Sequence, residues 1–198
     1  LNFERVKRAG IAATKFLVDA AETHAHRHLH HILELIDNAD LSQTAKTNAS
    51  AIFKRLGEVE AAVHNVPIER VHFHEVGAVD SIADIVGTCA ALDSLGIDTI
   101  YCSPLNVGSG TVKTEHGILP VPAPATAALL AGKPIYARGP AVELTTPTGA
   151  AVATTLAKEF GVMPPMTIAH TGYGAGGRDF PEQANVLRVL LGEPTGAP

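Results

Sequence analysis

Five histidines fall within eight positions of the segment HAHRHLHH, residues 24–31. Neutral imidazole is a ligand for nickel, copper, zinc and iron, and a spacing of i, i+4 on a helix lets two rings reach one ion. A solvated polar stripe is the alternative, but five rings so close together favour contact with a metal. The predicted metal ligands of this segment are His24, His26, His28, His30 and His31.

A second group of histidines lies in VHFHEVGAVD, residues 71–80. His72 and His74 are two positions apart, which on a strand puts both side chains on one face. Two imidazoles followed by the carboxylates of Glu75 and Asp80 can act as metal ligands or as a general acid–base set. The alternative is a solvated strand face with Asp80 as a helix cap, and the spacing alone does not decide between these readings.

Two further stretches can bind an anion. In ELTTPTGAA the backbone amides at a helix start favour negative charge, although ordinary helix capping explains the pattern as well. In GYGAGGRDFP the glycines permit positive φ angles and a nest of amides beside a basic side chain, although a structural turn with an Arg178–Asp179 contact explains the stretch nearly as well. The residues concerned are Thr145, Thr146, Thr148 and Gly149 in the first stretch and Arg178 in the second.

Composition narrows the function classes. The formal charge of −5 and the absence of Trp argue against a nucleic-acid-binding protein, because that class needs a basic patch with stacking rings. We find no apolar stretch near the roughly 18 residues that cross a bilayer, and no signal peptide. Cys89 and Cys102 lie in apolar surroundings and are predicted to be reduced thiols, which indicates a cytoplasmic protein.

The elements that must position these residues are predicted to be helical at first. Apolar residues three and four apart predict a helix over 3–20, with a break near Thr23 and a second helix from His28. Ser42 is predicted to cap a third helix that ends before Pro67. Residues 1–66 are therefore expected to be all-helical and to form a helical part that carries the His-rich segment.

From Val71 onward the pattern becomes that of an α/β body over residues 67–198. A strand at 71–74, a helix capped by Ser81 and ended by Gly96, and a strand after it predict a βαβ unit and a partly parallel sheet. A helix started by a proline and a strand within residues 121–139, a helix starting at Pro147, and two final strands near 167–170 and 185–191 complete it. The predicted fold class is α/β, with a mixed sheet and flanking helices.

Taken together and in order, VHFHEVGAVDSIADIVG, HGILPVPAPAT, ELTTPTGAA and GYGAGGRDFP followed by NVLRVLLGE resemble the LarC family of nickel insertases. The resemblance covers essentially the whole chain. It implies insertion of Ni²⁺ into pyridinium-3,5-bisthiocarboxylic acid mononucleotide, forming one Ni–C and two Ni–S bonds at the expense of CTP. It also implies an enzyme of the metal-inserting lyase (cyclometallase) type.

The resemblance gives the predicted residues roles. His72 and His74 join the His-rich segment as nickel ligands, and His74, Glu75 and Asp80 become candidates for the base that accepts the pyridinium C–H proton. The threonine-rich helix start or the Arg178 loop becomes the site for the substrate phosphate. The family's CTP-binding C-terminal half, with its divalent cation, has no counterpart here, so the chain is expected to be incomplete and to work with that half.

Two other functions fit the same residues. One is a nickel storage or chaperone module without catalysis, which would lose nearly all nickel binding with the residue 24–31 histidines. The other is a phosphate-binding enzyme in which the histidines are incidental, which would bind nucleotide equally well with or without metal. The sequence leaves the oligomeric state open, a homo-oligomer included.

Overall fold

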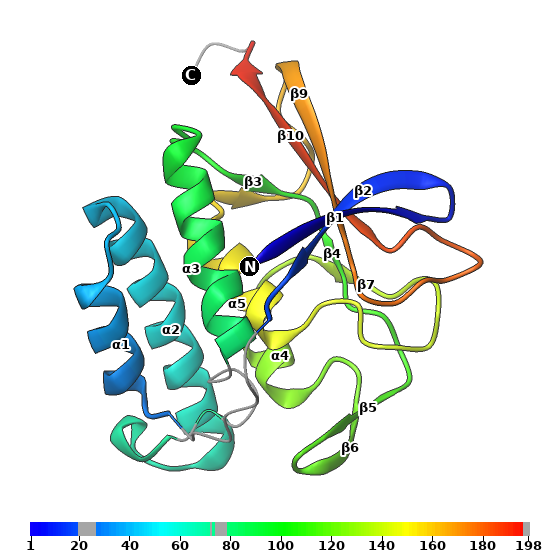
Figure 1. Cartoon of the computed structure of the whole chain (residues 1–198). Coiled ribbons are helices and arrows are strands. Elements are labelled where there is room, and N and C mark those ends of the chain that lie inside the picture. The colour runs from blue at the N-terminus through cyan, green and yellow to red at the C-terminus, as the bar shows by residue number, and fades with distance from the viewer. Residues whose placement is uncertain (20–26, 72, 74–78, 196–198) are drawn as a thin grey trace. The chain divides into compact units, whose positions relative to one another are not determined.

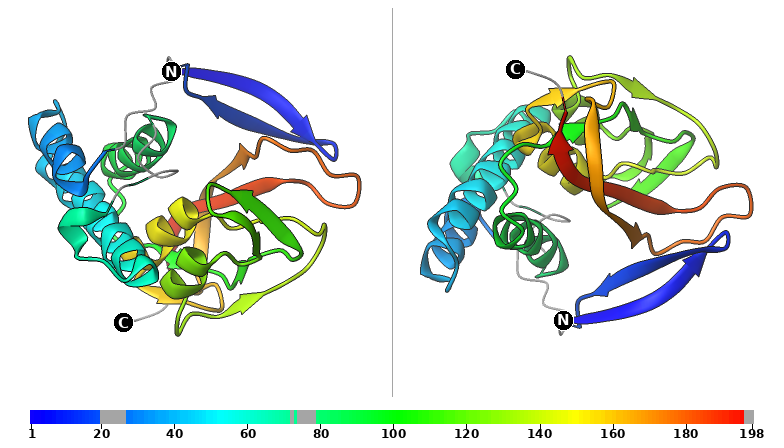
Figure 2. Two further views of the ribbon diagram at one scale, coloured as in Figure 1. Left: turned by 90° about the horizontal axis from the view of Figure 1, so that it is seen from below. Right: turned by 90° about the horizontal axis from the view of Figure 1, so that it is seen from above.

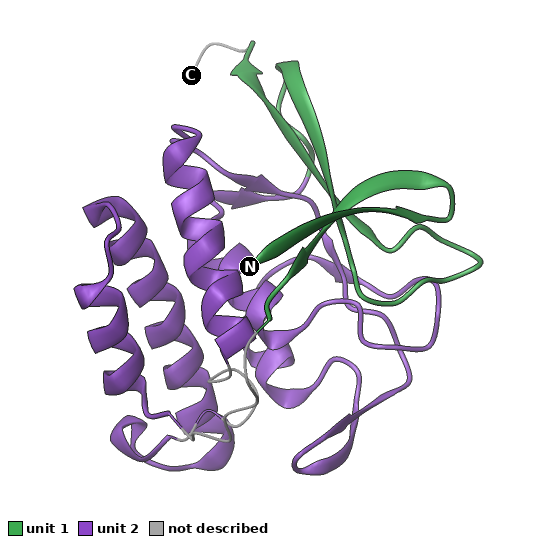
Figure 3. Ribbon diagram, viewed as in Figure 1, with its two compact units in different colours: residues 1–20, 162–198 green, residues 21–161 purple. Residues whose placement is uncertain are grey.

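The computed structural model of the chain describes residues 1–19, 27–71, 73 and 79–195. Its contacts divide the chain into two compact units, residues 1–20 with 162–198 and residues 21–161 (Figure 3). The division expected between residues 66 and 67 falls inside the second unit, because helices from both sides of that point share one core.

The first unit contains a four-stranded sheet in the order β1-β2-β9-β10 (Figure 1). Its strands are β1 (Asn2–Arg8), β2 (Ile11–Leu17), β9 (Met166–Ala175) and β10 (Val186–Pro194). The β1–β2 and β9–β10 pairs are antiparallel, whereas β2 pairs with β9 in parallel. The two strands expected near the end of the chain are confirmed.

The helix predicted over 3–20 is wrong, and residues 2–17 form the β1–β2 hairpin instead. Ala9 and Gly10 both have positive φ angles, 44° and 83°, which a two-residue turn of the type I′ class requires. Across the hairpin the rings of Phe3 and Phe16 lie 5.3 Å apart, a cross-strand pair that stabilises the register. Residues 1–66 are thus not helical throughout.

The second unit is built around a long central helix. Its helices are α1 (Leu29–Asn38), α2 (Gln43–His64), α3 (Val79–Ser94), α4 (Pro124–Leu129) and α5 (Pro147–Leu156), with a 3₁₀ turn at Ile68–Arg70. All the other α-helices contact α2, and Figure 2 shows α4 and α5 side by side next to it. The helices predicted at the N-terminal part of the chain are confirmed for α1 and α2.

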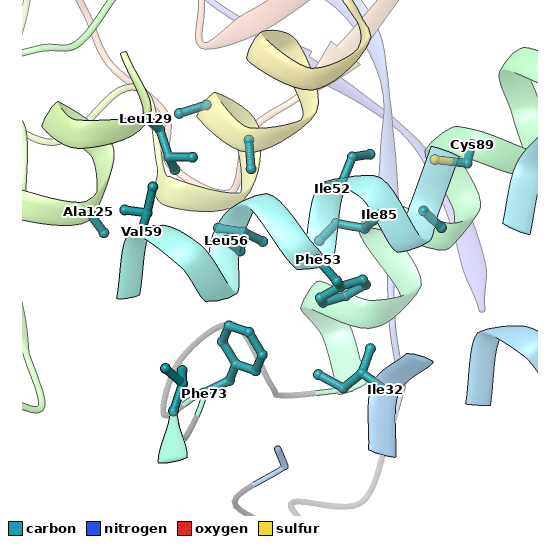
Figure 4. Packing of buried hydrophobic residues seen from close by; sticks show 14 of the residues in the cluster. Ile32, Ile52, Phe53, Leu56, Val59, Phe73, Ile85, Cys89, Ala125 and Leu129 are labelled. Carbon is teal, nitrogen blue, oxygen red and sulfur yellow. The ribbon is translucent and has the colours of Figure 1, made fainter. Parts of the chain in front are cut away.

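The core of this unit comes from one face of each helix (Figure 4). Ile52, Phe53 and Leu56 of α2 are fully buried, and the Phe53 ring meets the Phe73 ring edge-on at 6.4 Å. Ile32 and Ile36 of α1 are also buried, as the apolar spacing of that helix predicts. This packing positions α1, whose N-terminal end carries His28, His30 and His31.

The helix ends follow local chemistry. The Ser42 hydroxyl accepts from the Ala45 N–H at 3.1 Å, which confirms the predicted cap of α2. The predicted cap at Ser81 is wrong, because α3 already begins at Val79. Gly96 follows the end of α3 with a φ of 63°, a left-handed conformation that favours glycine.

Short strands line the rest of the second unit. They are β3 (Tyr101–Cys102), β4 (Leu105–Asn106), β5 (Thr111–Thr114), β6 (Gly117–Pro120), β7 (Ile135–Tyr136) and β8 (Glu159–Phe160). β3 pairs with β8 and β4 with β7 in parallel, while β5 and β6 form an antiparallel hairpin. The α/β class with mixed strands is confirmed, but the βαβ unit is not: after α3, β3 joins β8, and Phe73 makes its bridge to Arg27.

Both cysteines are free thiols, Cys89 buried and Cys102 half-buried. Within the described part of the chain, no helix is long and apolar enough to span a membrane.

Candidate functional site

The described histidines of the His-rich segment lie at the start of α1. His28 is half-buried at the N-cap, and His30 and His31 are exposed in the first turn. Ring centroids are 3.9 Å apart for His30 and His31, and 5.6–5.7 Å for His28 to each of them. The three imidazoles therefore form one cluster. His24 and His26 lie outside the described residues.

His28 is also tied to the core segment that follows the 3₁₀ turn. Its Nδ1 lies 3.2 Å from the carbonyl oxygen of Val71. The tautomer that makes this bond carries its proton on Nδ1 and its lone pair on Nε2. A ring nitrogen that donates to a backbone carbonyl while the other faces outward is the usual arrangement of a metal-ligating histidine.

The structure brings the two histidine-bearing segments together. The Phe73 N–H donates to the Arg27 carbonyl at 3.3 Å, so Arg27 and His28 lie beside Phe73 and Val71 although 43 residues separate His28 from Val71. Val71 and Phe73 are each 2% exposed and anchor this junction in the core. His72, His74 and Glu75 lie outside the described residues.

Among the residues that the structure describes, no three His, Cys, Asp or Glu side chains are already arranged to hold an ion. The described imidazoles alone thus give a cluster of donors and not a closed site. Sequence spacing predicted each histidine group separately, but it could not show that their backbones pair.

Asp80 lies exposed in the first turn of α3. Its Oδ1 accepts from the Ser81 N–H at 2.8 Å, a contact between neighbouring residues within the first turn. Partial burial, and secondarily the nearby Asp80 carboxylate, raise the pKa of Asp84. The two carboxylates therefore concentrate negative charge at this helix start.

The threonine-rich stretch forms the N-terminus of α5. Thr146 is the N-cap, and its hydroxyl accepts from the Gly149 N–H at 3.2 Å. Thr145 is buried and donates to the Asn106 carbonyl at 2.8 Å. Thr148 is half-buried in the first turn behind Pro147. Two of the three hydroxyls thus have structural partners, which favours the capping reading.

The glycine-rich stretch is not an amide nest. Gly172 and Gly174 are residues of β9, and neither they nor Gly176 and Gly177 have positive φ angles. Gly176 is held from both sides: its carbonyl accepts from the Arg8 guanidinium at 2.9 and 3.0 Å, and its N–H donates to Asn185.

Arg178 is exposed in the β9–β10 connection of the first unit. Asn185 binds its backbone carbonyl at 2.9 Å, which fixes the chain on which the guanidinium stands. The threonines of the other predicted anion site belong to the second unit.

The sequence analysis missed one group of potential metal ligands. His64 Nε2 lies 3.3 Å from Glu60 Oε2, and the rings of His64 and His116 lie 4.8 Å apart. The i, i+4 spacing of Glu60 and His64 on a helix was a detectable signal. Nothing in the sequence indicated that His116, more than 50 residues later, would approach His64.

A family model described as nickel insertion protein matches residues 1–197. A protein named as a nickel insertion protein from Citrifermentans bemidjiense is 55% identical over all of this chain and 51% of its own length. One from Rhodopirellula baltica is 50% identical over all of this chain and 50% of its own length.

A third relative, from Geobacillus kaustophilus, is 46% identical over 98% of this chain and 50% of its own length. It is named pyridinium-3,5-bisthiocarboxylic acid mononucleotide nickel insertion protein. The chain thus spans about half the length of the curated relatives it matches. No solved structure matches it.

Proposed function

The chain belongs to the nickel insertion protein family, and on this premise we propose that it is the nickel-handling part of an enzyme that inserts nickel into pyridinium-3,5-bisthiocarboxylic acid mononucleotide. The observation that carries the proposal is the contact of Arg27 and His28, in the His-rich segment, with buried Phe73 and Val71. The family model covers residues 1–197, and the relatives above are 46–55% identical to this chain. The name of one of these relatives supports the substrate class of the proposal.

In this proposal, Ni²⁺ passes by ligand exchange from imidazoles of the protein to the thiocarboxylate sulfurs of the substrate. Imidazole binds Ni²⁺ well but less tenaciously than thiolate, whereas the thiocarboxylate sulfurs of the substrate are soft donors that favour nickel over hard cations. We assign delivery of the ion to the cluster of His28, His30 and His31, together with His24 and His26. His72 and His74 would then present it at the substrate.

Formation of the Ni–C bond releases one proton. Ni²⁺ takes the electron pair of the pyridinium C–H bond, and the proton passes to a base, so charge and atoms balance without an oxidant. We propose His74, Glu75 and Asp80 as candidates for that base. Asp80 is the weakest of the three, because its Oδ1 already accepts from the Ser81 N–H.

The substrate phosphate needs a cationic or amide-rich partner. Arg178 is the better candidate, since its guanidinium is exposed on a backbone fixed by Asn185. The α5 start, Thr145 to Gly149, is the weaker one, since the Gly149 amide already donates to Thr146. Arginine binds phosphate in a bidentate way that a lone helix start does not reproduce.

CTP and its divalent cation belong, in this proposal, to the part of the relatives that this chain does not span. The chain supplies nickel and the pyridinium site, and the other half supplies the nucleotide-dependent step. Under this division of roles the enzyme is a metal-inserting lyase of the cyclometallase type.

The test replaces His72 or His74 by Ala in the complete enzyme and measures melting temperature and nickel insertion on the same samples. The alternation with buried Val71 and Phe73 predicts that neither change opens a core cavity, so melting should change little. Insertion should be abolished. Normal insertion in both variants contradicts the proposed site, and a large loss of melting temperature indicates a structural role instead.

A further inference from the structure

A second histidine group lies at the C-terminal end of α2, within the second unit. Glu60 and His64 are one helical turn apart, and His64 is the last residue of the helix. His116 approaches from the turn between β5 and β6. Neither the family model nor the relatives' names assign any role to these residues.

The distances match those between ligands of one ion. Imidazole nitrogen and carboxylate oxygen bind ions such as Zn²⁺ at about 2.0–2.2 Å, so two such ligands on one ion lie about 3.0–3.4 Å apart at angles from square to tetrahedral. His64 Nε2 and Glu60 Oε2 are separated by 3.3 Å. Two imidazoles on one ion have ring centroids about 4.5–5.2 Å apart on the same reckoning, and the rings of His64 and His116 are 4.8 Å apart.

The electrostatics of this helix end favour a cation. Glu60 and His64 lie in the last turns of α2, the end of the helix that carries the negative end of its dipole. The Glu60 side chain is only 19% exposed, and its ion-pair partner among the described residues is His64. A bound divalent ion would offset the carboxylate charge in this partly covered place.

The third ligand must move to complete the site. No three described side chains already enclose an ion, so the Glu60–His64 pair is the preformed part. His116 stands on an exposed hairpin turn whose backbone is held by the Thr114 hydroxyl, which accepts from the His116 N–H at 3.1 Å. In the proposed site, a change of the His116 side-chain rotamer brings one of its ring nitrogens to the ion.

We propose that Glu60, His64 and His116 form a second binding site for a late first-row divalent metal ion, made by residues outside the His-rich segment. Two imidazoles and one carboxylate give a nitrogen- and oxygen-donor site without thiolate, which holds such an ion while allowing it to exchange. The inference rests on the proposed function only for the choice of Ni²⁺ as the ion. It makes this helix end a place where nickel is taken up or held before insertion.

The test uses the chain itself, labelled with ¹⁵N, and Ni²⁺ as the probe near pH 7.5. Imidazole NMR signals of His64 and His116 are assigned by their loss in His64→Ala and His116→Ala. Substoichiometric Ni²⁺ should shift or broaden both signals together. Either alanine variant, and Glu60→Gln, should weaken nickel binding at this site by at least about 10-fold, because even the outer partners of metal ligands are worth about 10–100-fold in affinity.

The matched control is His170→Ala, which removes an exposed histidine from β9 in the other unit and should leave this site unchanged. Melting curves check that each variant folds. The inference is overturned when Ni²⁺ leaves the His64 and His116 signals unmoved, or when Glu60→Gln and His64→Ala bind as the wild-type chain does. If the site fails this test while the complete enzyme still inserts nickel, the proposed function stands without the second site. If nickel binds at Glu60, His64 and His116 but the complete enzyme inserts none, only the proposed function is overturned.

Discussion

Cys89 is a thiol with no exposed surface, and burial raises its pKa to about 11 from an ordinary value of 9.0. In the unfolded chain the thiol ionises first, so between those two pH values the folded state binds more protons than the unfolded state. The contribution of the neutral thiol to the free energy of unfolding is fully present below pH 9 and is lost as the pH rises toward 11.

We therefore expect the free energy of unfolding to fall between about pH 9 and pH 11, by up to roughly 2–3 kcal/mol from this group. Urea unfolding at several pH values measures it, and Cys89→Ala is the matched control. The variant loses some stability at every pH, yet its curve should be flatter over this window. Parallel curves for the two proteins would show that Cys89 ionises normally.

Thr146 caps α5, and its hydroxyl satisfies the Gly149 amide. Thr146→Ala should lower the free energy of unfolding by about 1 kcal/mol, the usual cost of losing such a cap, while Thr146→Ser should retain it. Thr148→Ala, two positions on, is the comparison and should have a smaller effect. Equal losses in the two alanine variants would show that the hydroxyl of Thr146 does not act as a cap.

At the residue scale, the sequence predicted what short-range chemistry determines. The caps at Ser42 and Thr146, and the apolar face of α1, depend on residues within about four positions and were found. The amide nest expected at Gly172–Gly177 was not found, because pairing of β9 with β10 holds Gly172 and Gly174 in strand conformation. Glycine permits a positive φ but does not impose one.

The β1–β2 hairpin turns on two residues with positive φ, of which Ala9 lacks the conformational freedom of glycine. An Asn-Gly pair is the preferred sequence for such a turn, and an L-residue such as alanine costs about 1–2 kcal/mol there. Ala9→Asn should therefore raise the free energy of unfolding by about 1 kcal/mol in chemical denaturation. Gly10→Ala is its opposite and should destabilise; a stabilised Gly10→Ala chain would contradict this turn.

At the element scale, long-range pairing explains what sequence reasoning missed. Apolar residues of the 3–17 stretch recur at helical spacing, but β2 finds its partner in β9, with Thr14 opposite Gly174. Likewise β3 joins β8 and not the 71–73 segment, whose Phe73 bridges to Arg27. Periodicity reports local preference, and these partners lie tens to more than a hundred residues away.

At the scale of the molecule, family membership is shown over the whole chain, while the division of roles between its halves stays a prediction. So does a cytoplasmic location. The sequence motifs indicated the family because all of them occur in one order, and the structure added the contact of Arg27 and His28 with Phe73 and Val71.

Because CTP use is assigned to the half that the chain does not span, the purified chain alone should not consume CTP. Incubation with Ni²⁺, a divalent cation and the mononucleotide, followed by chromatography of the nucleotides, measures this. The complete protein under the same conditions is the positive control. CTP consumed by the chain alone would refute the division of roles.

The central claim is that this chain handles nickel for insertion into a pyridinium mononucleotide. The most direct measurement is mass spectrometry of that mononucleotide after incubation with the complete protein, Ni²⁺ and CTP, beside a protein in which the histidines at 24, 26, 28, 30 and 31 are replaced by alanine. We expect the mononucleotide to gain one nickel atom with the intact protein, and much more slowly with the variant at limiting nickel. Nickel that stays on the protein while the mononucleotide keeps its mass would contradict the claim and indicate a storage module.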